Sequence, residues 1–162
     1  SVIHLMALQA PVASDLREMV SILFIVTDLE RIADHAEGIA RIALFLEEDT
    51  AATAVPDLWE MAEKVRAMLR SSIASFFDRD DALARATCDL DDEVDTLYDS
   101  IHRKILQQLV KSPIDQHELD VLTHVLWASH NLERIGDRST NICERAIFLV
   151  TGRLEEINVS SY

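Results

Sequence analysis

Two seven-residue stretches decide how this chain folds. The first is DLERIAD at Asp28–Asp34, and the second is NLERIGD at Asn131–Asp137, 103 residues further along. Each stretch has apolar residues at helical spacing and an aspartate four residues after a glutamate. Extending the comparison to residues 28–47 and 131–150 gives nine identities in 20 positions, among them Glu, Arg and Asp. Unrelated amphipathic helices share Leu and Ile positions but not charged ones, so we interpret the similarity as an internal duplication.

The composition around these stretches predicts an all-α fold. The 162 residues are 49% hydrophobic and only 6% aromatic, with three Gly and three Pro. A sandwich or barrel needs more turn and strand residues than this. The apolar periodicity predicts four helices and no strand, with residues 1–10 as the end of a further helix and Gly152 as a C-cap. The predicted helices cover residues 12–47, 58–77, 81–110 and 116–150.

Several side chains are predicted to pack inside this helical fold. On the first long helix, the apolar stripe consists of Ile22, Ile25, Leu29, Ile32, Ala36, Ile39 and Ala43. Cys88 and Cys143 are expected in the core, and Trp59 and Trp127 are interpreted as packing residues. Two cysteines provide no disulfide framework and are typical of a reducing cytosol.

The duplication divides the chain into units of three helices. The second unit is complete at residues 57–152, residues 1–50 hold mainly the last helix of the first unit, and residues 153–162 form a tail. Subtracting the offset of 103 places the start of the first unit before Ser1, so the first bundle is expected to be truncated. We therefore expect tandem three-helix bundles of long antiparallel helices. The first long helix then needs cover from the second repeat or from another chain, most simply in a homodimer.

The charge balance excludes one class of partner. With 15 basic and 29 acidic residues, the net charge is −14, which repels a nucleic-acid backbone and attracts cations or basic protein surfaces. No basic region opens the chain as in a signal peptide, and the longest charge-free stretch, residues 1–14, is too short to cross a bilayer. The expected location is cytoplasmic.

The acidic residues of the second repeat are predicted to gather in one region. Glu133 and Asp137 are one turn apart on one face of a helix. We expect the third predicted helix to fold back against the last one through the turn at residues 112–115. Two residues at equal distances from the centre of that turn then lie opposite each other, and their numbers sum to about 227. The predicted cluster consists of Glu133, Asp137, Asp91, Asp92 and Asp95, with Asp99 nearby on a less certain face.

Clustered carboxylates repel one another unless protons or cations intervene, and oxygen ligands at this spacing suit divalent metals. The alternative is a solvated acidic face, with Glu133 and Asp137 paired to Arg134 or Arg138. The pair recurs at Glu30 and Asp34, but the residues that would lie opposite those two acids on the preceding helix would fall before Ser1. We therefore expect only half of the ligands of a metal site there. Three histidines near the acids, His35, His102 and His130, are interpreted as boundary residues rather than ligands. No Glu-x-x-His pair of a di-iron oxidase, P-loop or zinc-type cluster is present in the sequence.

Residues 131–144, NLERIGDRSTNICE, closely resemble the signature helix of PhoU-type phosphate-uptake regulators. Residues 11–17, PVASDLR, resemble the matching helix of that family's first repeat, and residues 92–98, DEVDTLY, resemble the helix before the second signature. The resemblance implies a pair of three-helix bundles whose Glu/Asp-x-x-x-Asp motifs bind metal ions. One departure is internal: Ala33 stands where the second copy has Gly136, so helices are expected to approach less closely there.

The resemblance also implies a function. Such a protein is a cytoplasmic, usually dimeric negative regulator of phosphate uptake and phosphate-starvation signalling, without catalysis of its own. Its partners are the ATPase subunit of a phosphate ABC transporter and a phosphate-sensing histidine kinase, so it is peripheral to membrane complexes. Its metal is a divalent or trivalent ion, with iron, zinc, manganese and magnesium as the candidates. The alternative is a metal-dependent enzyme that uses the carboxylate cluster, but no nucleophile, base or substrate pocket can be assigned beside the acids.

Overall fold

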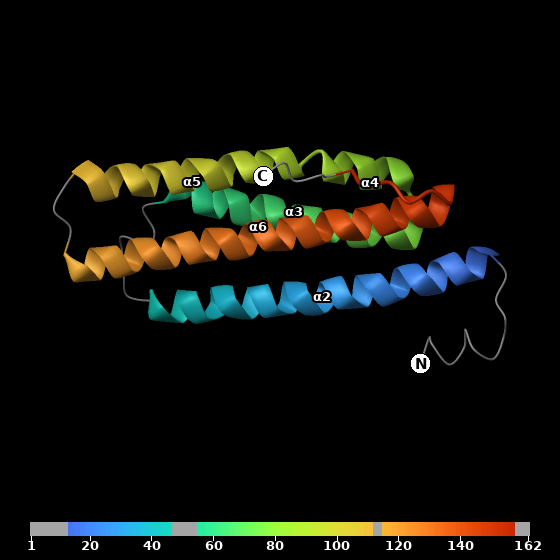
Figure 1. Ribbon diagram of the computed structural model, residues 1–162, viewed down its shortest axis with the longest axis horizontal. Coiled ribbons are helices and arrows are strands. Elements are labelled where there is room, and N and C mark those ends of the chain that lie inside the picture. The colour runs from blue at the N-terminus through green and yellow to red at the C-terminus, as the bar shows by residue number, and fades with distance from the viewer. Residues whose placement is uncertain (1–12, 47–54, 112–114, 158–162) are drawn as a thin grey trace.

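The computed structural model describes residues 13–46, 55–111 and 115–157, and this part of the chain is all-α, with no strand (Figure 1). The predicted fold class is confirmed. The described helices are α2 (Ala13–Phe45), α3 (Pro56–Asp78), α4 (Asp81–Cys88), α5 (Asp91–Lys111) and α6 (Gln116–Thr151). The helix end expected at residues 1–10, and Pro11 and Pro113, lie outside the described residues.

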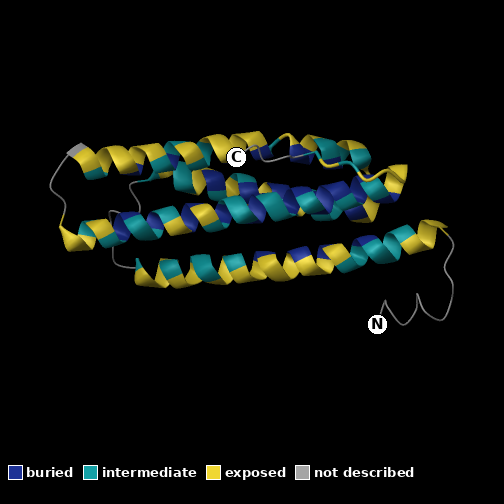
Figure 2. Cartoon of the chain, viewed as in Figure 1, coloured by how far each residue is buried: buried dark blue, intermediate teal, exposed yellow. Residues whose placement is uncertain are grey.

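Helix α6 is the centre of the molecule. It contacts α3, α4 and α5, which form a bundle on one side of it, and α2, which runs antiparallel to it on the other side (Figure 1). Figure 2 shows the consequence, because α6 is buried along most of its length whereas α2 is mostly exposed or half-buried. Three fully buried α6 side chains, Ile142, Cys143 and Ile147, lie in the main core.

The helix ends follow local sequence signals. The Asp80 carboxylate accepts a hydrogen bond of 2.9 Å from the Leu83 amide at the start of α4, and Asp115 accepts one of 2.8 Å from Glu118 at the start of α6. Gly152 has a φ of 73° and donates its amide to the Phe148 carbonyl at 2.9 Å. The predicted C-cap is therefore confirmed, since glycine adopts this left-handed conformation without a Cβ penalty.

The single helix predicted over residues 81–110 is wrong, because the structure divides it into α4 and α5. Asp89 caps the end of α4, and a short turn carries the chain into α5. Asp91, Asp92 and Glu93 then occupy the first turn of α5. Acids are stabilised at a helix N-terminus, so a new start at this point suits the sequence better than a helix interior. Apolar periodicity alone does not reveal the break.

Two predictions about packing were also wrong. Trp59 and Trp127 are 62% and 55% exposed, whereas Met61 and Val125, two residues away, are 0% exposed and fill the core. Each tryptophan lies on the outward side of a helix that buries only one stripe. The expected burial of Cys88 and Cys143 is confirmed.

The predicted stripe of α2 is only partly buried. Ile25 and Ile32 are buried against the core, but Leu29, Ala36 and Ala43 are exposed. The reason is geometric: α2 packs mainly against one neighbour, α6, which covers a narrower face than a bundle of helices would. The division of the chain into a truncated first repeat and a complete second repeat stays a prediction.

Candidate metal centre

The start of α5 packs closely against α6 at one glycine. A Cβ atom on Gly136 would lie 3.2 Å from Oδ1 of Asp91 and 3.6 Å from Cγ1 of Val94. Asp91 and Gly136 have numbers that sum to 227, so the predicted fold-back register is confirmed. Asp91 is 2% exposed, so its carboxylate lies in the interface between the two helices.

The carboxylates of α5 meet those of α6 at this level. Burial, and then the nearby charges of Asp95, Asp137, Asp92 and Glu133, raise the pKa of Asp91 from 3.8 to about 7. Burial and the charges of Asp137, Asp92 and Asp99 likewise raise the pKa of Asp95. These acids therefore share one region, as the sequence predicted.

The two acids that α6 contributes to the cluster, Glu133 and Asp137, also have raised pKa values. Burial and the charge of Asp137 raise the pKa of Glu133 from 4.5 to about 7, although the guanidinium of Arg134 acts in the opposite direction. Burial also raises the pKa of Asp137 despite Arg134 and Arg138. Without a cation, this cluster holds protons near neutral pH more tightly than ordinary carboxyl groups do.

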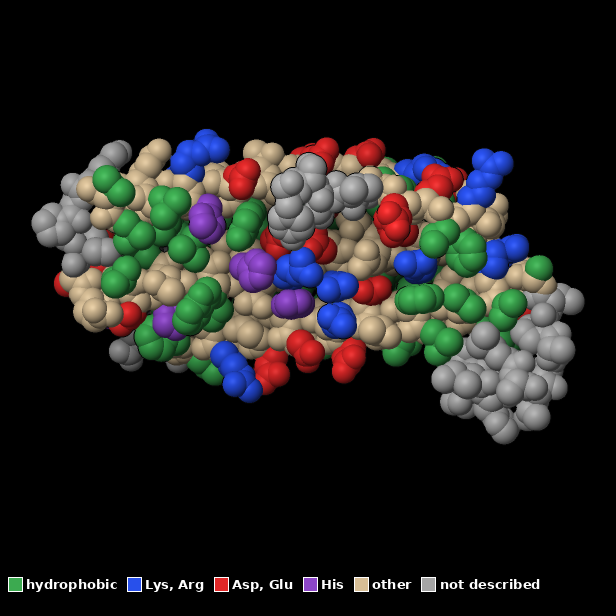
Figure 3. Space-filling model, viewed as in Figure 1, with side chains coloured by type: hydrophobic (Ala, Val, Ile, Leu, Met, Phe, Trp, Pro, Cys, Tyr) green, Lys and Arg blue, Asp and Glu red, His purple; other side chains and the backbone are tan. Residues whose placement is uncertain are grey.

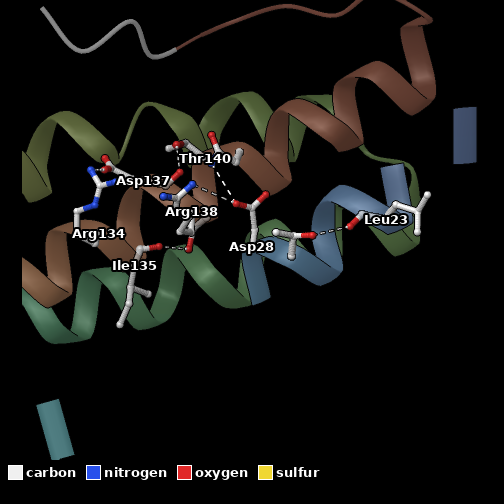
Figure 4. A network of polar contacts seen from close by, with 10 residues as sticks. Leu23, Asp28, Arg134, Ile135, Asp137, Arg138 and Thr140 are labelled. Atoms are coloured by element: carbon white, nitrogen blue, oxygen red, sulfur yellow. Dashed lines mark hydrogen bonds and ion pairs between the residues drawn. The ribbon is translucent and has the colours of Figure 1, made fainter. Parts of the chain in front are cut away.

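One member of the cluster has a cationic partner on its own helix. Nη1 of Arg134 donates to Oδ2 of Asp137 at 2.8 Å, as Figure 4 shows. Part of the alternative arrangement, in which arginine pairs with the acids, is therefore present in the structure. By contrast, Oε2 of Glu133 is buried without a hydrogen bond, and it lies 3.5 Å from Nδ1 of His130, whose pKa is lowered mainly by burial.

The remaining predicted site residues lie at the edge or elsewhere. Asp92 and Asp99, like Asp95, are exposed on α5, and their charges act on Asp91 or Asp95. Glu30 and Asp34 are exposed on α2, and neither makes a hydrogen bond or ion pair with another described residue. The structure therefore brings four of the predicted acids together, namely Asp91, Asp95, Glu133 and Asp137.

The histidines behave largely as boundary residues. Nδ1 of His35 donates to Oδ1 of Asn131 at 2.9 Å between α2 and α6. The ring of His102 lies 5.6 Å from the ring of Tyr98, and the ring of His130 lies 6.4 Å from it.

The donor chemistry of the cluster fits a metal ion, although its side chains are not assembled around one. Within the described ranges, no three His, Cys, Asp or Glu side chains are placed so that they could hold a metal together. The buried, unpartnered oxygen of Glu133 and the mutual repulsion of the four acids are nevertheless what a divalent cation would relieve. The donor chemistry suits the metal ion that the sequence predicted, and metal binding at this cluster stays a prediction.

A polar contact between α2 and α6 was missed by the sequence analysis. The buried carboxylate of Asp28 accepts hydrogen bonds from Arg138 at 3.5 Å and Asn141 at 3.3 Å. Shifted by the repeat offset of 103, Asp28 corresponds to Asn131 and Arg138 corresponds to His35, which are the other interhelical pair. The two contacts are thus related by the duplication. Applying the offset to both helices at once would have predicted them.

The comparisons with known proteins agree with this architecture. The PhoU domain family matches residues 1–43 and 58–146, and the chain belongs to this family. A PhoU homolog of the phosphate-specific transport system accessory proteins from Clostridium acetobutylicum is 39% identical over 97% of this chain. A homolog with the same description from Zymomonas mobilis is 35% identical over 93% of it. This chain spans 71% of the first relative and 62% of the second.

Solved structures of the family share the fold. The crystal structure of PhoU from Pseudomonas aeruginosa superposes with a TM-score of 0.84 at 32% identity, over 94% of this chain and 72% of that one. The phosphate transport system regulatory protein PhoU from Streptococcus pneumoniae gives 0.83 at 33% identity, over 96% and 72%. Among the described helices, none has a stretch that is long and apolar enough to cross a membrane.

Proposed function

We propose that this chain regulates phosphate uptake and phosphate-starvation signalling as a negative regulator without catalysis of its own. The observation that carries the proposal is the 39% identity, over 97% of the chain, to a protein described as a phosphate-specific transport system accessory protein. Its partners would be the ATPase subunit of a phosphate ABC transporter and a phosphate-sensing histidine kinase. It would act in the cytoplasm as a homodimer and reach the membrane only through these complexes.

The charge of the chain supports protein partners with basic surfaces. The net charge is −14, and on the face shown in Figure 3 acidic side chains lie along both edges. Basic and histidine side chains gather at the middle of that face, and hydrophobic side chains gather toward its ends. Such a surface favours association through complementary charge, which salt weakens. Binding to a purified transporter ATPase or kinase domain should therefore weaken as the salt concentration rises.

The metal site is part of the proposal. Glu133 and Asp137 of α6 would hold a cation of iron, zinc, manganese or magnesium together with Asp91 and Asp95 of α5. When bound, such a cation supplies positive charge that neutralises carboxylates and fixes two helices to each other. The carboxylates themselves supply the hard oxygen donors, and Gly136 allows the Asp91 carboxylate to lie against α6. Metal content would then control how rigid the α5–α6 surface is when a partner binds.

A genetic experiment tests the regulatory role. Deleting the gene should raise expression of phosphate-starvation genes in phosphate-rich medium, and the wild-type gene should restore repression. A gene carrying Glu133→Gln and Asp137→Asn should restore it less well, while Glu30→Gln with Asp34→Asn provides the matched control. A deletion that removes a metabolic step but leaves these genes repressed would instead support the metal-dependent enzyme.

A further inference from the structure

The guanidinium of Arg134 is the cation that the carboxylate cluster already contains. It donates to Asp137 at 2.8 Å, and the two side chains are 29% and 26% exposed, so water screens the pair only in part. Arg134 also acts against the raised pKa of both Glu133 and Asp137. Figure 4 shows its side chain directed along α6 toward Asp137, whereas Arg138 points to Asp28 on the neighbouring helix.

The two α6 acids, Asp137 and Glu133, differ in their hydrogen bonding. Asp137 has one oxygen committed to Arg134, while Oε2 of Glu133, one turn earlier, is buried without a hydrogen bond. An oxygen that accepts a hydrogen bond from a guanidinium N–H is less available to a cation, and a nearby positive charge repels that cation. Arginine does not release its proton in proteins, so the guanidinium must move for Asp137 to become a full ligand.

We propose that Arg134 is an internal competitor for the metal ion: it holds Asp137 in the metal-free protein and releases it when a divalent cation binds, so it sets the affinity of the site. This inference rests on the metal site proposed above. The Arg134 side chain can move away from Asp137 into water, because 29% of it is already exposed.

The duplication provides a matched control. Arg31 follows Glu30 as Arg134 follows Glu133, and it is exposed on α2. It makes no ion pair with Asp34 or with any other described residue. A substitution of Arg31 therefore removes the same charge from the chain without releasing a carboxylate of the cluster.

Calorimetric titration of the whole chain with Mn²⁺ alone tests the proposal. Arg134→Gln should bind Mn²⁺ roughly five- to tenfold more tightly than wild type, the range expected for loss of a partly shielded ion pair. Arg31→Gln should bind as wild type does. A second readout is metal-free: the melting temperature of Arg134→Gln should fall, because the acids lose their counter-ion, and added Mn²⁺ should raise it by more than it raises that of wild type.

Two other results would overturn the competitor role of Arg134, and they differ in what they imply for the metal site. If Arg134→Gln binds Mn²⁺ equally or more weakly while Asp137→Asn abolishes binding, the competitor role is overturned and the metal site stands. If neither wild type nor Arg134→Gln binds Mn²⁺, the competitor and the metal site both fail. Should Arg134→Gln not fold, Arg134→Lys keeps the charge but weakens the paired geometry, and it should tighten binding by a smaller factor.

Discussion

The two copies of the duplicated motif lie in different surroundings. On α6, Glu133 and Asp137 are half-buried and face the start of α5, whereas on α2, Glu30 and Asp34 are exposed. The motifs share Glu, Arg and Asp at the same spacing, and in the α6 copy burial raises the pKa of both acids, Glu133 and Asp137. The Glu-x-x-x-Asp motif is present in both copies, but only the α6 copy faces α5, which supplies the further carboxylates of the cluster.

The difference extends to one small side chain. Gly136 lets the Asp91 carboxylate approach α6 closely, since a Cβ atom would lie 3.2 Å from Oδ1. Ala33 occupies the equivalent place on α2 and is exposed. The α6 copy therefore accommodates the close approach of α5 at Gly136.

Removing the acids of one copy should give the largest effect. For a metal ion at 100 times its Kd, binding stabilises the folded state by about 2.7 kcal/mol. Glu133→Gln with Asp137→Asn should abolish this Mn²⁺-dependent rise in melting temperature. Glu30→Gln with Asp34→Asn should retain it. Thermal unfolding with and without Mn²⁺ measures both, and equal losses in the two double variants would remove the distinction between the copies.

The pH dependence of stability should come from the α6 copy. The pKa values of Asp91 and Glu133 rise from 3.8 and 4.5 to about 7 on folding. Groups with raised pKa contribute stability that is complete below about pH 4 and is lost as pH rises through about 7. The free energy of unfolding without metal should therefore fall, on the order of 2 kcal/mol, between pH 5 and pH 8.

Denaturant titrations of the metal-free protein at the two pH values measure this change. Asp91→Asn removes one of the groups and should flatten the dependence. A wild-type protein that is more stable at pH 8 than at pH 5 would contradict the assigned sign.

The two interhelical contacts related by the duplication should differ in strength. Asp28 is 8% exposed and accepts from both Arg138 and Asn141, so Asp28→Ala leaves two donors without their acceptor. We expect a loss of about 2 kcal/mol in the free energy of unfolding. Asn131→Ala removes the half-buried contact with His35 and should cost about 1 kcal/mol. Urea unfolding gives both values, and an inverted order would show that the His35 contact is the stronger one.

The glycine and alanine at equivalent positions give the smallest expected effect. Ala33→Gly should lower the free energy of unfolding by about 1 kcal/mol through helix propensity alone. Gly136→Ala should bring no matching gain, because the new Cβ meets Asp91 at 3.2 Å and Val94 at 3.6 Å. A gain of the full propensity difference in the Gly136→Ala variant would mean that the carboxylate moves away freely.

Much of this fold was predictable from sequence because helical signals are local. Apolar periodicity predicted the all-α class, and Gly152 was identified as a C-cap. Counting residues from the turn at 112–115 placed Asp91 opposite Gly136. That last result explains why the acid cluster was predictable: once two helices are joined by a short turn, their register is fixed by residue count.

The failures involve choices that local signals do not determine. The break between α4 and α5 depends on acids at a new helix start, which periodicity does not detect. Leu29 fits an apolar stripe as well as Ile25 does, but which of them is buried depends on where α6 lies. Similarly, Arg134 and Arg138 were equal candidates for pairing with the motif acids, and only the position of Asp28 on α2 separates their roles.

Crystals of the whole chain grown with Mn²⁺, measured for anomalous scattering from manganese, test the central claim most directly. The account predicts a manganese peak between α5 and α6 within ligand distance of Glu133 and Asp137, with no peak beside Glu30 and Asp34. A peak beside Glu30 and Asp34 with none at α6, or no manganese peak at either copy, would contradict it.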